Sequence, residues 1–263
     1  SFQPDVLILI DYPGFNMRVA KFAKKRGIKV VYYITPQVWA WKKGRIKKLK
    51  RYTDLLLTIL PFEKDFLAKN GAESTFVGHP LLDEMTDNNM KSVETEKPII
   101  ALLPGSRKQE IKNMLPLMME LSDHFKDYQF IIAGAPSISH GFYRGITGDS
   151  YLPISNNKTY EVLKGAKAAI ITSGTAVLEA AILEVPQVVC YRTSAFSYWI
   201  GKKIIKVSFI SLVNLILNRQ VVTELVQSDF NKENLIQELD KLLNKKHKKT
   251  LLREYKILIK KLG

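Results

Sequence analysis

Short apolar runs alternate with segments of helical period along almost the whole chain, and this alternation restricts the fold more than any other sequence feature. We expect strands at residues 6–10, 29–34, 54–60, 74–77, 99–103, 129–133, 168–171 and 187–191. Helical patterns lie between them; residues 61–70 are typical, with proline in the first turn and glycine after the end. Strands that alternate with helices build parallel sheets under helical layers. The sequence therefore predicts an α/β fold with two Rossmann-like sheets in series.

The distribution of polar residues divides the chain into parts. Residues 86–97 lack an apolar period, so we predict a linker between a first α/β domain, residues 1–85, and a second, residues 98–230. Two amphipathic helices are expected over residues 231–263.

The 263 residues are 46% hydrophobic, which is enough for a substantial core. The one cysteine, Cys190, lies in an apolar run and is expected to be buried, in a reducing compartment.

An anion-binding loop is predicted where the run at 168–171 gives way to a helix. Ser173 and Gly174 form a tight turn, and a helix that begins near Thr175 directs free N–H groups and its positive dipole end outward. Glu179 falls one turn later, where a carboxylate can accept hydrogen bonds from ribose hydroxyls. The pattern fits a nucleotide site. For this segment alone, an ordinary turn with a capping hydroxyl and a solvated glutamate is an equal alternative.

A second loop of the same kind follows the run at 99–103. Gly105 permits the turn, Ser106 can cap the next helix, and Arg107 supplies a fork-shaped cation for a diphosphate. Many such arginines contact only solvent, so this loop is weak support on its own. Because the carboxyl ends of parallel strands meet at one edge of a sheet, we expect the two loops to share a site there.

Seven motifs, in order along the chain, resemble those of one enzyme family. They are Asp11-Tyr12-Pro13-Gly14-Phe15-Asn16, Pro36-Gln37-Val38-Trp39-Ala40-Trp41, Leu60-Pro61-Phe62-Glu63, Gly78-His79-Pro80, Leu103-Pro104-Gly105-Ser106-Arg107, Ser173-Gly174-Thr175-Ala176 and Ser211-Leu212-Val213-Asn214. The set is similar to the lipid-A-disaccharide synthases. Members also carry a Gly-Glu-Ala-Ser-Gly-Asp type loop that has no counterpart here, so we expect the first domain to be incomplete.

The resemblance implies a GT-B glycosyltransferase of Gram-negative bacteria, in which two Rossmann-like domains face a cleft. It implies an inverting reaction that joins UDP-2,3-diacylglucosamine to 2,3-diacylglucosamine 1-phosphate. The product is the β-1,6-linked lipid A disaccharide precursor, and UDP is released. The expected location is the cytoplasm, peripheral on the inner face of the cytoplasmic membrane.

Such a transfer needs a base for the attacking hydroxyl, and Asp11 is the candidate. It lies at the carboxyl end of the run at 6–10, where an alternative role is to cap the next helix; the resemblance favours the base. His79, Asn214 and Glu224 are further candidates for contact with substrate. The sequence has no Asp-x-Asp motif and its four histidines are scattered, so we expect no metal and no other cofactor.

A net charge of +15 indicates anionic partners. Seven of the ten residues 42–51 are lysine or arginine. We expect this basic segment to contact an anionic membrane surface through Trp39, Trp41, Lys42, Lys43, Arg45, Lys47 and Lys48. A solvated lysine-rich face and nonspecific nucleic-acid binding are the alternatives, although no nucleic-acid-reading motif accompanies the charge.

Two other functions are compatible with parts of this pattern. Another GT-B enzyme that acts on a UDP-sugar, such as a 2-epimerase or a peptidoglycan glycosyltransferase, would share the donor loops but not the motifs around Asp11 and Trp39. A noncatalytic UDP-binding module at a membrane surface is the second alternative. Assembly into a homo-oligomer is also left open by the sequence.

Overall fold

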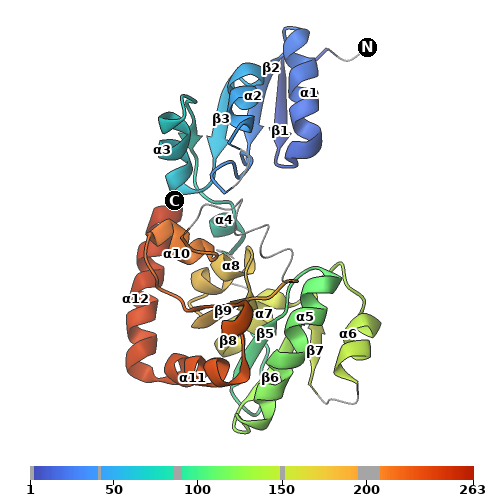
Figure 1. Cartoon of the computed structure of the whole chain (residues 1–263), viewed down its shortest axis with the longest axis vertical. Helices are drawn as coiled ribbons and strands as arrows, with labels where there is room; N and C mark the ends of the chain where they lie inside the picture. Colours follow the sequence, from blue (N-terminus) through green and yellow to red (C-terminus); the bar gives the residue numbers. More distant parts are fainter. Residues whose placement is uncertain (1–2, 41–42, 86–90, 149–151, 195–207) are drawn as a thin grey trace. The chain divides into compact units, whose positions relative to one another are not determined.

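The chain folds into two compact units, each built on its own parallel sheet (Figure 1). The computed structural model describes residues 3–40, 43–85, 91–148, 152–194 and 208–263. Within these ranges, residues 3–83 and 260–263 form the N-terminal unit, and residues 84–259 form the C-terminal unit. The α/β fold with two parallel sheets, predicted from the alternation of strand and helix patterns, is confirmed.

The N-terminal unit has a four-stranded sheet with the strands in chain order. Its strands are β1 (Val6–Ile10), β2 (Lys29–Tyr33), β3 (Leu55–Thr58) and β4 (Thr75–Phe76). The helices that follow them are α1 (Pro13–Lys25), α2 (Arg45–Tyr52), α3 (Pro61–Lys69) and α4 (Leu81–Met85). Residues 38–40 form a turn ahead of α2, which begins at Arg45.

The core of this unit lies on one face of the sheet. Leu9, Val30 and Leu56 from the strands cluster with buried residues of α1, α2 and α3. The other face of β1 is open: Val6, Ile8 and Ile10 are 45%, 62% and 56% exposed. Parallel strands are normally covered on both faces, so the exposure of this face of β1 is unusual.

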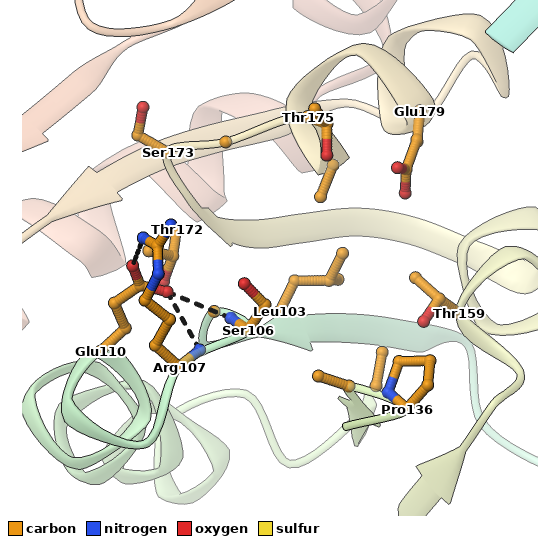
Figure 2. A pocket seen from close by; sticks show the side chains of 15 residues that line it. Leu103, Ser106, Arg107, Glu110, Pro136, Thr159, Thr172, Ser173, Thr175 and Glu179 are labelled. Carbon is orange, nitrogen blue, oxygen red and sulfur yellow. Dashed lines mark hydrogen bonds and ion pairs between the residues drawn. The ribbon is translucent and has the colours of Figure 1, made fainter. Parts of the chain in front are cut away.

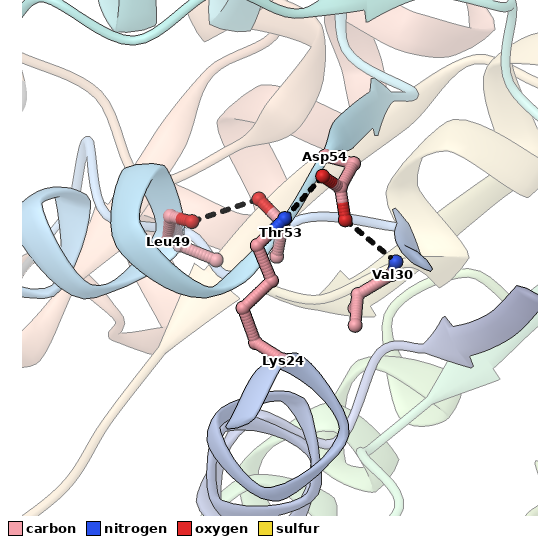
Figure 3. Close-up of polar contacts among 5 residues, drawn as sticks. All are labelled: Lys24, Val30, Leu49, Thr53 and Asp54. Carbon is pink, nitrogen blue, oxygen red and sulfur yellow. Dashed lines mark hydrogen bonds and ion pairs between the residues drawn. The ribbon is translucent and has the colours of Figure 1, made fainter. Parts of the chain in front are cut away.

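A small polar cluster ties α1 to the sheet (Figure 3). The carboxylate of Asp54 accepts a hydrogen bond from the Val30 amide at 2.9 Å and pairs with the Lys24 ammonium. The hydrogen bond from Lys24, followed by that from Val30, lowers the pKa of Asp54. Next to it, the Thr53 hydroxyl donates to the Leu49 carbonyl at 2.8 Å at the end of α2. The positive charge of Lys24 is therefore balanced within the unit.

The C-terminal unit has a six-stranded parallel sheet in the order β10-β9-β8-β5-β6-β7. Its strands are β5 (Ile99–Leu103), β6 (Gln129–Gly134), β7 (Ile154–Asn156), β8 (Ala166–Thr172), β9 (Gln187–Tyr191) and β10 (Glu224–Val226). Counted from β5, this is the strand order of the dinucleotide-binding Rossmann fold, which reverses direction between its first and fourth strands. The switch point therefore lies between β5 and β8, which are hydrogen-bonded neighbours.

Helices cover this sheet and complete its core. They are α5 (Lys108–Met119), α6 (His140–Thr147), α7 (Thr159–Gly165), α8 (Ala176–Ile182), α10 (Leu212–Leu217), α11 (Lys232–Leu243) and α12 (Lys245–Leu262), with short 3-10 turns η1 (Glu120–Asp123) and η2 (Gln227–Asp229). The two amphipathic helices expected at the end of the chain are confirmed as α11 and α12. Cys190 is fully buried in β9, as its apolar surroundings predicted.

Candidate functional site

A cavity of about 430 Å³ lies at the switch point of the C-terminal sheet. The loop between β5 and α5 and the loop between β8 and α8 both line it (Figure 2). Among the residues around it are Gly105, Ser106, Arg107, Ser173, Gly174, Thr175 and Glu179. The structure thus brings together all seven residues that the sequence predicts to bind the nucleotide and its diphosphate, and their ligand remains a prediction.

The first loop is organised by Glu110, one turn into α5. Its carboxylate accepts hydrogen bonds from the amides of Ser106 and Arg107 at 3.1 and 3.2 Å, and pairs with the Arg107 guanidinium at 2.6 Å. Figure 2 shows these contacts at the mouth of the loop. The prediction that Ser106 caps the helix was wrong, because the carboxylate of Glu110 takes the free amides instead.

Gly105 is needed here for two reasons. Its φ of +115° lies in the region that side chains rarely adopt, and a Cβ at this position would lie 2.8 Å from Glu110. The loop therefore surrounds a carboxylate closely with two amides and a guanidinium. These are the same donors that bind a phosphate oxygen. The Arg107 side chain is 80% exposed, so it is accessible to a ligand.

The second loop presents polar groups from the end of β8. The Ser173 amide donates to the Cys190 carbonyl at 2.9 Å and its hydroxyl donates to the Ile210 carbonyl at 2.8 Å, so this residue is fixed. In the described part of the chain, the amides of Gly174 and Thr175 have no acceptor. The hydroxyl of Thr172, which lines the cavity and is buried, also lacks a partner among the described residues. Buried polar groups are nearly always paired, so the Thr172 hydroxyl favours a polar ligand in the cavity, and the exposed amides of Gly174 and Thr175 are accessible to the same ligand.

Glu179 stands opposite the first loop, on α8 (Figure 2). Burial, and then the negative charge of Glu84, raises the pKa of Glu179 to about 7. Burial and the charges of Glu179 and Glu84 together raise the pKa of Tyr160 to about 12, so this phenol stays protonated. A carboxyl with a pKa near neutrality in a cavity is a mark of a functional site.

Asp11 follows β1 in an unusual backbone conformation. Asp11 and Tyr12 have φ values of +46° and +43°, in the left-handed region. The Asp11 carbonyl holds this turn in place by accepting hydrogen bonds from Tyr32 at 2.7 Å and from Asn16 at 2.8 Å. Within the described residues no hydrogen bond reaches the Asp11 carboxylate, and the N-cap of α1 is Tyr12. The alternative role of Asp11 as a side-chain cap is therefore not observed, and its role as a base remains a prediction.

The other substrate candidates do not line this cavity. His79 is buried in the N-terminal unit, where its Nδ1 accepts from the Leu81 amide at 3.3 Å and burial lowers its pKa. Asn214 is fully buried. Its side-chain NH₂ group donates to the Glu224 carboxylate at 2.8 Å, and its side-chain oxygen Oδ1 accepts from the backbone amides of Val221 and Val222. The hydrogen-bonding capacity of Asn214 is thus used inside the protein. Contact of these residues with substrate stays a prediction.

The basic segment is partly built into the N-terminal core. The Trp39 indole donates to Glu63 at 3.0 Å and packs edge-on against Phe62, with ring centroids 5.1 Å apart. Ile46 and Leu49, the apolar residues of α2, face the core. Trp41 and Lys42 lie outside the described residues. Lys43, Lys47 and Lys48 are exposed and Arg45 is half-buried, and their contact with a membrane remains a prediction.

None of the helices in the described ranges combines the length and the apolarity needed to cross a bilayer. In the same ranges, no three histidine, cysteine or acidic side chains are grouped as metal ligands would be.

Glu110 and Thr172 are among the cavity residues that the sequence did not predict. Glu110 follows Arg107 by three positions, which is the spacing of a capping box, so a signal was present. Thr172 follows an apolar run, and no sequence pattern marks it as a site residue. Its candidacy rests on a buried hydroxyl without a hydrogen-bond partner among the described residues, which only the structure shows.

Comparison with known proteins identifies relatives of this chain. A family model described as lipid-A-disaccharide synthetase matches residues 1–261. The lipid-A-disaccharide synthase of Coxiella burnetii (strain RSA 331 / Henzerling II) is 40% identical over 252 residues, which cover 92% of this chain and 67% of that protein. The chain thus spans about two thirds of the length of such relatives.

Solved structures share its fold. A putative UDP-N-acetylglucosamine 2-epimerase from Listeria monocytogenes superimposes with a TM-score of 0.66 at 13% identity, covering 95% of this chain and 69% of that one. UDP-GlcNAc 2-epimerase from Methanocaldococcus jannaschii, in complex with UDP-GlcNAc and UDP, gives a TM-score of 0.59 at 18% identity, covering 97% and 75%. At these identities the likeness concerns the fold alone, which is of the GT-B type.

The family predicted from the motifs is confirmed by the family model and by relatives at about 40% identity. Because the match runs from residue 1 to residue 261, it includes both units and both cavity loops. The chain belongs to the lipid-A-disaccharide synthase family of glycosyltransferases.

Proposed function

We propose that this protein transfers 2,3-diacylglucosamine from its UDP donor to 2,3-diacylglucosamine 1-phosphate, with inversion, forming the β-1,6-linked lipid A disaccharide precursor. Family membership supports the reaction class. The observation that carries the donor site is the convergence of two glycine-bearing loops and Glu179 on one cavity at the switch point of a parallel sheet. The proposed location is the cytoplasm, at the inner face of the membrane that holds the acylated substrates.

The donor binds through the C-terminal unit in this proposal. The amides of Gly174 and Thr175 and the guanidinium of Arg107 hold the diphosphate, and Glu179 accepts hydrogen bonds from the ribose. Arg107 now pairs with Glu110, so the diphosphate competes with that carboxylate for the guanidinium. The same donors stabilise the negative charge that develops on UDP as it leaves, with no metal ion.

Asp11 acts as the base on the acceptor side. It takes the proton of the acceptor's 6-hydroxyl as that oxygen attacks the anomeric carbon of the donor, and the bond between this carbon and the diphosphate breaks with its electron pair going to UDP. The strained turn at Asp11, fixed through its carbonyl, keeps the carboxylate at the end of β1 without a competing partner among the described residues.

Transfer of labelled UDP-diacylglucosamine to the acylated acceptor tests this function. Asp11→Asn should lower kcat by about 100-fold or more and leave calorimetric UDP affinity unchanged. Asp5→Asn, at the opposite end of the same strand, is the matched control and should keep full turnover. Full turnover of Asp11→Asn would remove the base from this proposal.

The same assay separates the alternatives. A 2-epimerase would convert plain UDP-GlcNAc without an acceptor, and a peptidoglycan glycosyltransferase would use a UDP-sugar without acyl chains. A noncatalytic module would bind UDP and transfer nothing. Identity of 40% to lipid-A-disaccharide synthases, against 13% and 18% to the epimerases, favours the first proposal.

A further inference from the structure

A second cavity, of about 370 Å³, lies in the N-terminal unit between α1 and α2. Arg18 and Lys21 line it from α1, and Arg45 and Lys48 line it from α2. Residues three or four positions apart on a helix share a face, so each helix directs both of its cations to the cavity. Met17 and Tyr52 add an apolar wall and a phenol.

The lining of this cavity is cationic. None of its lining residues is acidic. Among the described residues, no carboxylate lies within ion-pair distance of Arg18, Lys21 or Lys48. Lys24, one turn after Lys21 on α1, differs because it pairs with Asp54 (Figure 3). Like charges that converge on a hollow repel one another, and a bound anion removes that cost.

The chemistry of the lining selects a phosphate group among anions. Arginine binds two phosphate oxygens at once through its planar fork, lysine adds point charges, and a phenol can donate one hydrogen bond. The volume exceeds that of a phosphate alone and leaves room beside Met17 for the group that carries it.

The cavity also lies close to the proposed base. Pro13 and Gly14, directly after the Asp11 turn, form part of its wall. The Tyr32 hydroxyl donates to the Asp11 carbonyl at 2.7 Å.

We propose that the α1–α2 cavity binds a phosphate monoester, the group carried by sugar 1-phosphates and by phosphatidic acid. With a sugar 1-phosphate as occupant, this inference rests on the proposed function, and the cavity then holds the acceptor's phosphate while its hydroxyl meets Asp11. With phosphatidic acid as occupant, the same four cations dock the protein on a lipid surface. Either source uses Lys21 and Lys48 as ligands of the phosphate oxygens.

Two double variants test the site by binding alone. Lys21→Glu with Lys48→Glu reverses two cations inside the cavity. Lys25→Glu with Lys50→Glu makes the same change of net charge on the same two helices, at exposed positions that do not line it. The probes are glucosamine 1-phosphate, followed by calorimetry, and vesicles with and without phosphatidic acid, followed by sedimentation. Thermal unfolding and UDP affinity are measured for every protein.

We expect the cavity pair to weaken binding of at least one probe by 10-fold or more, and the control pair to change it by less than 2-fold, with UDP affinity unchanged in both. An effect on glucosamine 1-phosphate identifies the sugar phosphate as the source, and an effect confined to phosphatidic acid vesicles identifies the lipid headgroup. Equal losses in the two pairs, or no loss in either, would overturn the site. If the glutamate variants do not fold, Lys21→Gln with Lys48→Gln replaces them under the same criteria. These experiments measure binding and no turnover, so a negative result does not contradict the proposed glycosyl transfer, which the transfer assay tests separately.

Discussion

The pH dependence of stability offers a direct test of the electrostatics at Glu179. Burial and the charge of Glu84 raise its pKa from 4.5 to about 7. An unfolded chain ionises this carboxyl near 4.5, so between pH 4.5 and 7 the folded protein binds more protons than the unfolded chain does. The free energy of unfolding therefore falls as the pH rises through this window, and the contribution of Glu179 is constant above it.

The size of the effect follows from the pKa. A tenfold change in acidity corresponds to about 1.4 kcal/mol, so ionised Glu179 costs the C-terminal unit at most about 3.5 kcal/mol. Glu179→Gln keeps the shape and removes the charge. At pH 8 we expect this variant to be more stable than the wild type by about 2–3 kcal/mol, and at pH 4.5 to match it within about 0.5 kcal/mol.

Urea unfolding of the ligand-free protein, followed by circular dichroism from pH 4.5 to 8.5, measures this difference. Glu84→Gln is the companion variant. This variant removes only the repulsion between Glu84 and Glu179, which is the smaller cause of the raised pKa of Glu179. The increase in the free energy of unfolding at pH 8 should therefore have the same sign as for Glu179→Gln and be smaller. A Glu179→Gln variant that is less stable than the wild type at pH 8, or a difference that does not change with pH, would refute the reasoning.

Two further substitutions test the roles of individual side chains. Arg107→Ala should weaken UDP affinity by about 10-fold or more, because charge-assisted hydrogen bonds contribute about 1.5–3 kcal/mol; an unchanged calorimetric Kd would remove Arg107 from the diphosphate site. Asn214→Ala should lower the free energy of unfolding by about 3 kcal/mol, since it leaves the buried amide of Val222 without its acceptor and removes one of the hydrogen bonds to the Glu224 carboxylate. A fully stable Asn214→Ala protein that fails to bind substrate would favour a direct contact instead.

The sequence predicts this fold best where strands are apolar on both faces. Residues 99–103 and 187–191 coincide with β5 and β9, because a strand covered on two sides needs an uninterrupted apolar run. The short strands β7 and β10 were not predicted. Each has three residues of mixed polarity, and a period of two cannot be recognised over such a length.

The position of Trp39 could not be predicted from its neighbours in the chain. Its aromatic and basic surroundings are typical of a membrane-surface helix. In the structure its ring lies against Phe62 and its N–H group meets Glu63, which also caps α3 by accepting from the Leu60 amide at 3.1 Å. These partners are more than twenty residues away, so the contact is tertiary and leaves no local signal.

The site shows the same division between local signal and tertiary context. Gly105 and Gly174 mark loops whose place follows from topology, since the two strands before them are neighbours at a switch point. Asn214 and Glu224 were selected by family pattern, and such a pattern does not distinguish contact with substrate from support of the site. The carboxylate of Glu224 accepts from the amides of Ile210 and Ser211, and the Ile210 carbonyl accepts from the Ser173 hydroxyl. This network ends at a cavity residue, so it can constrain the site by fixing Ser173 without touching a ligand.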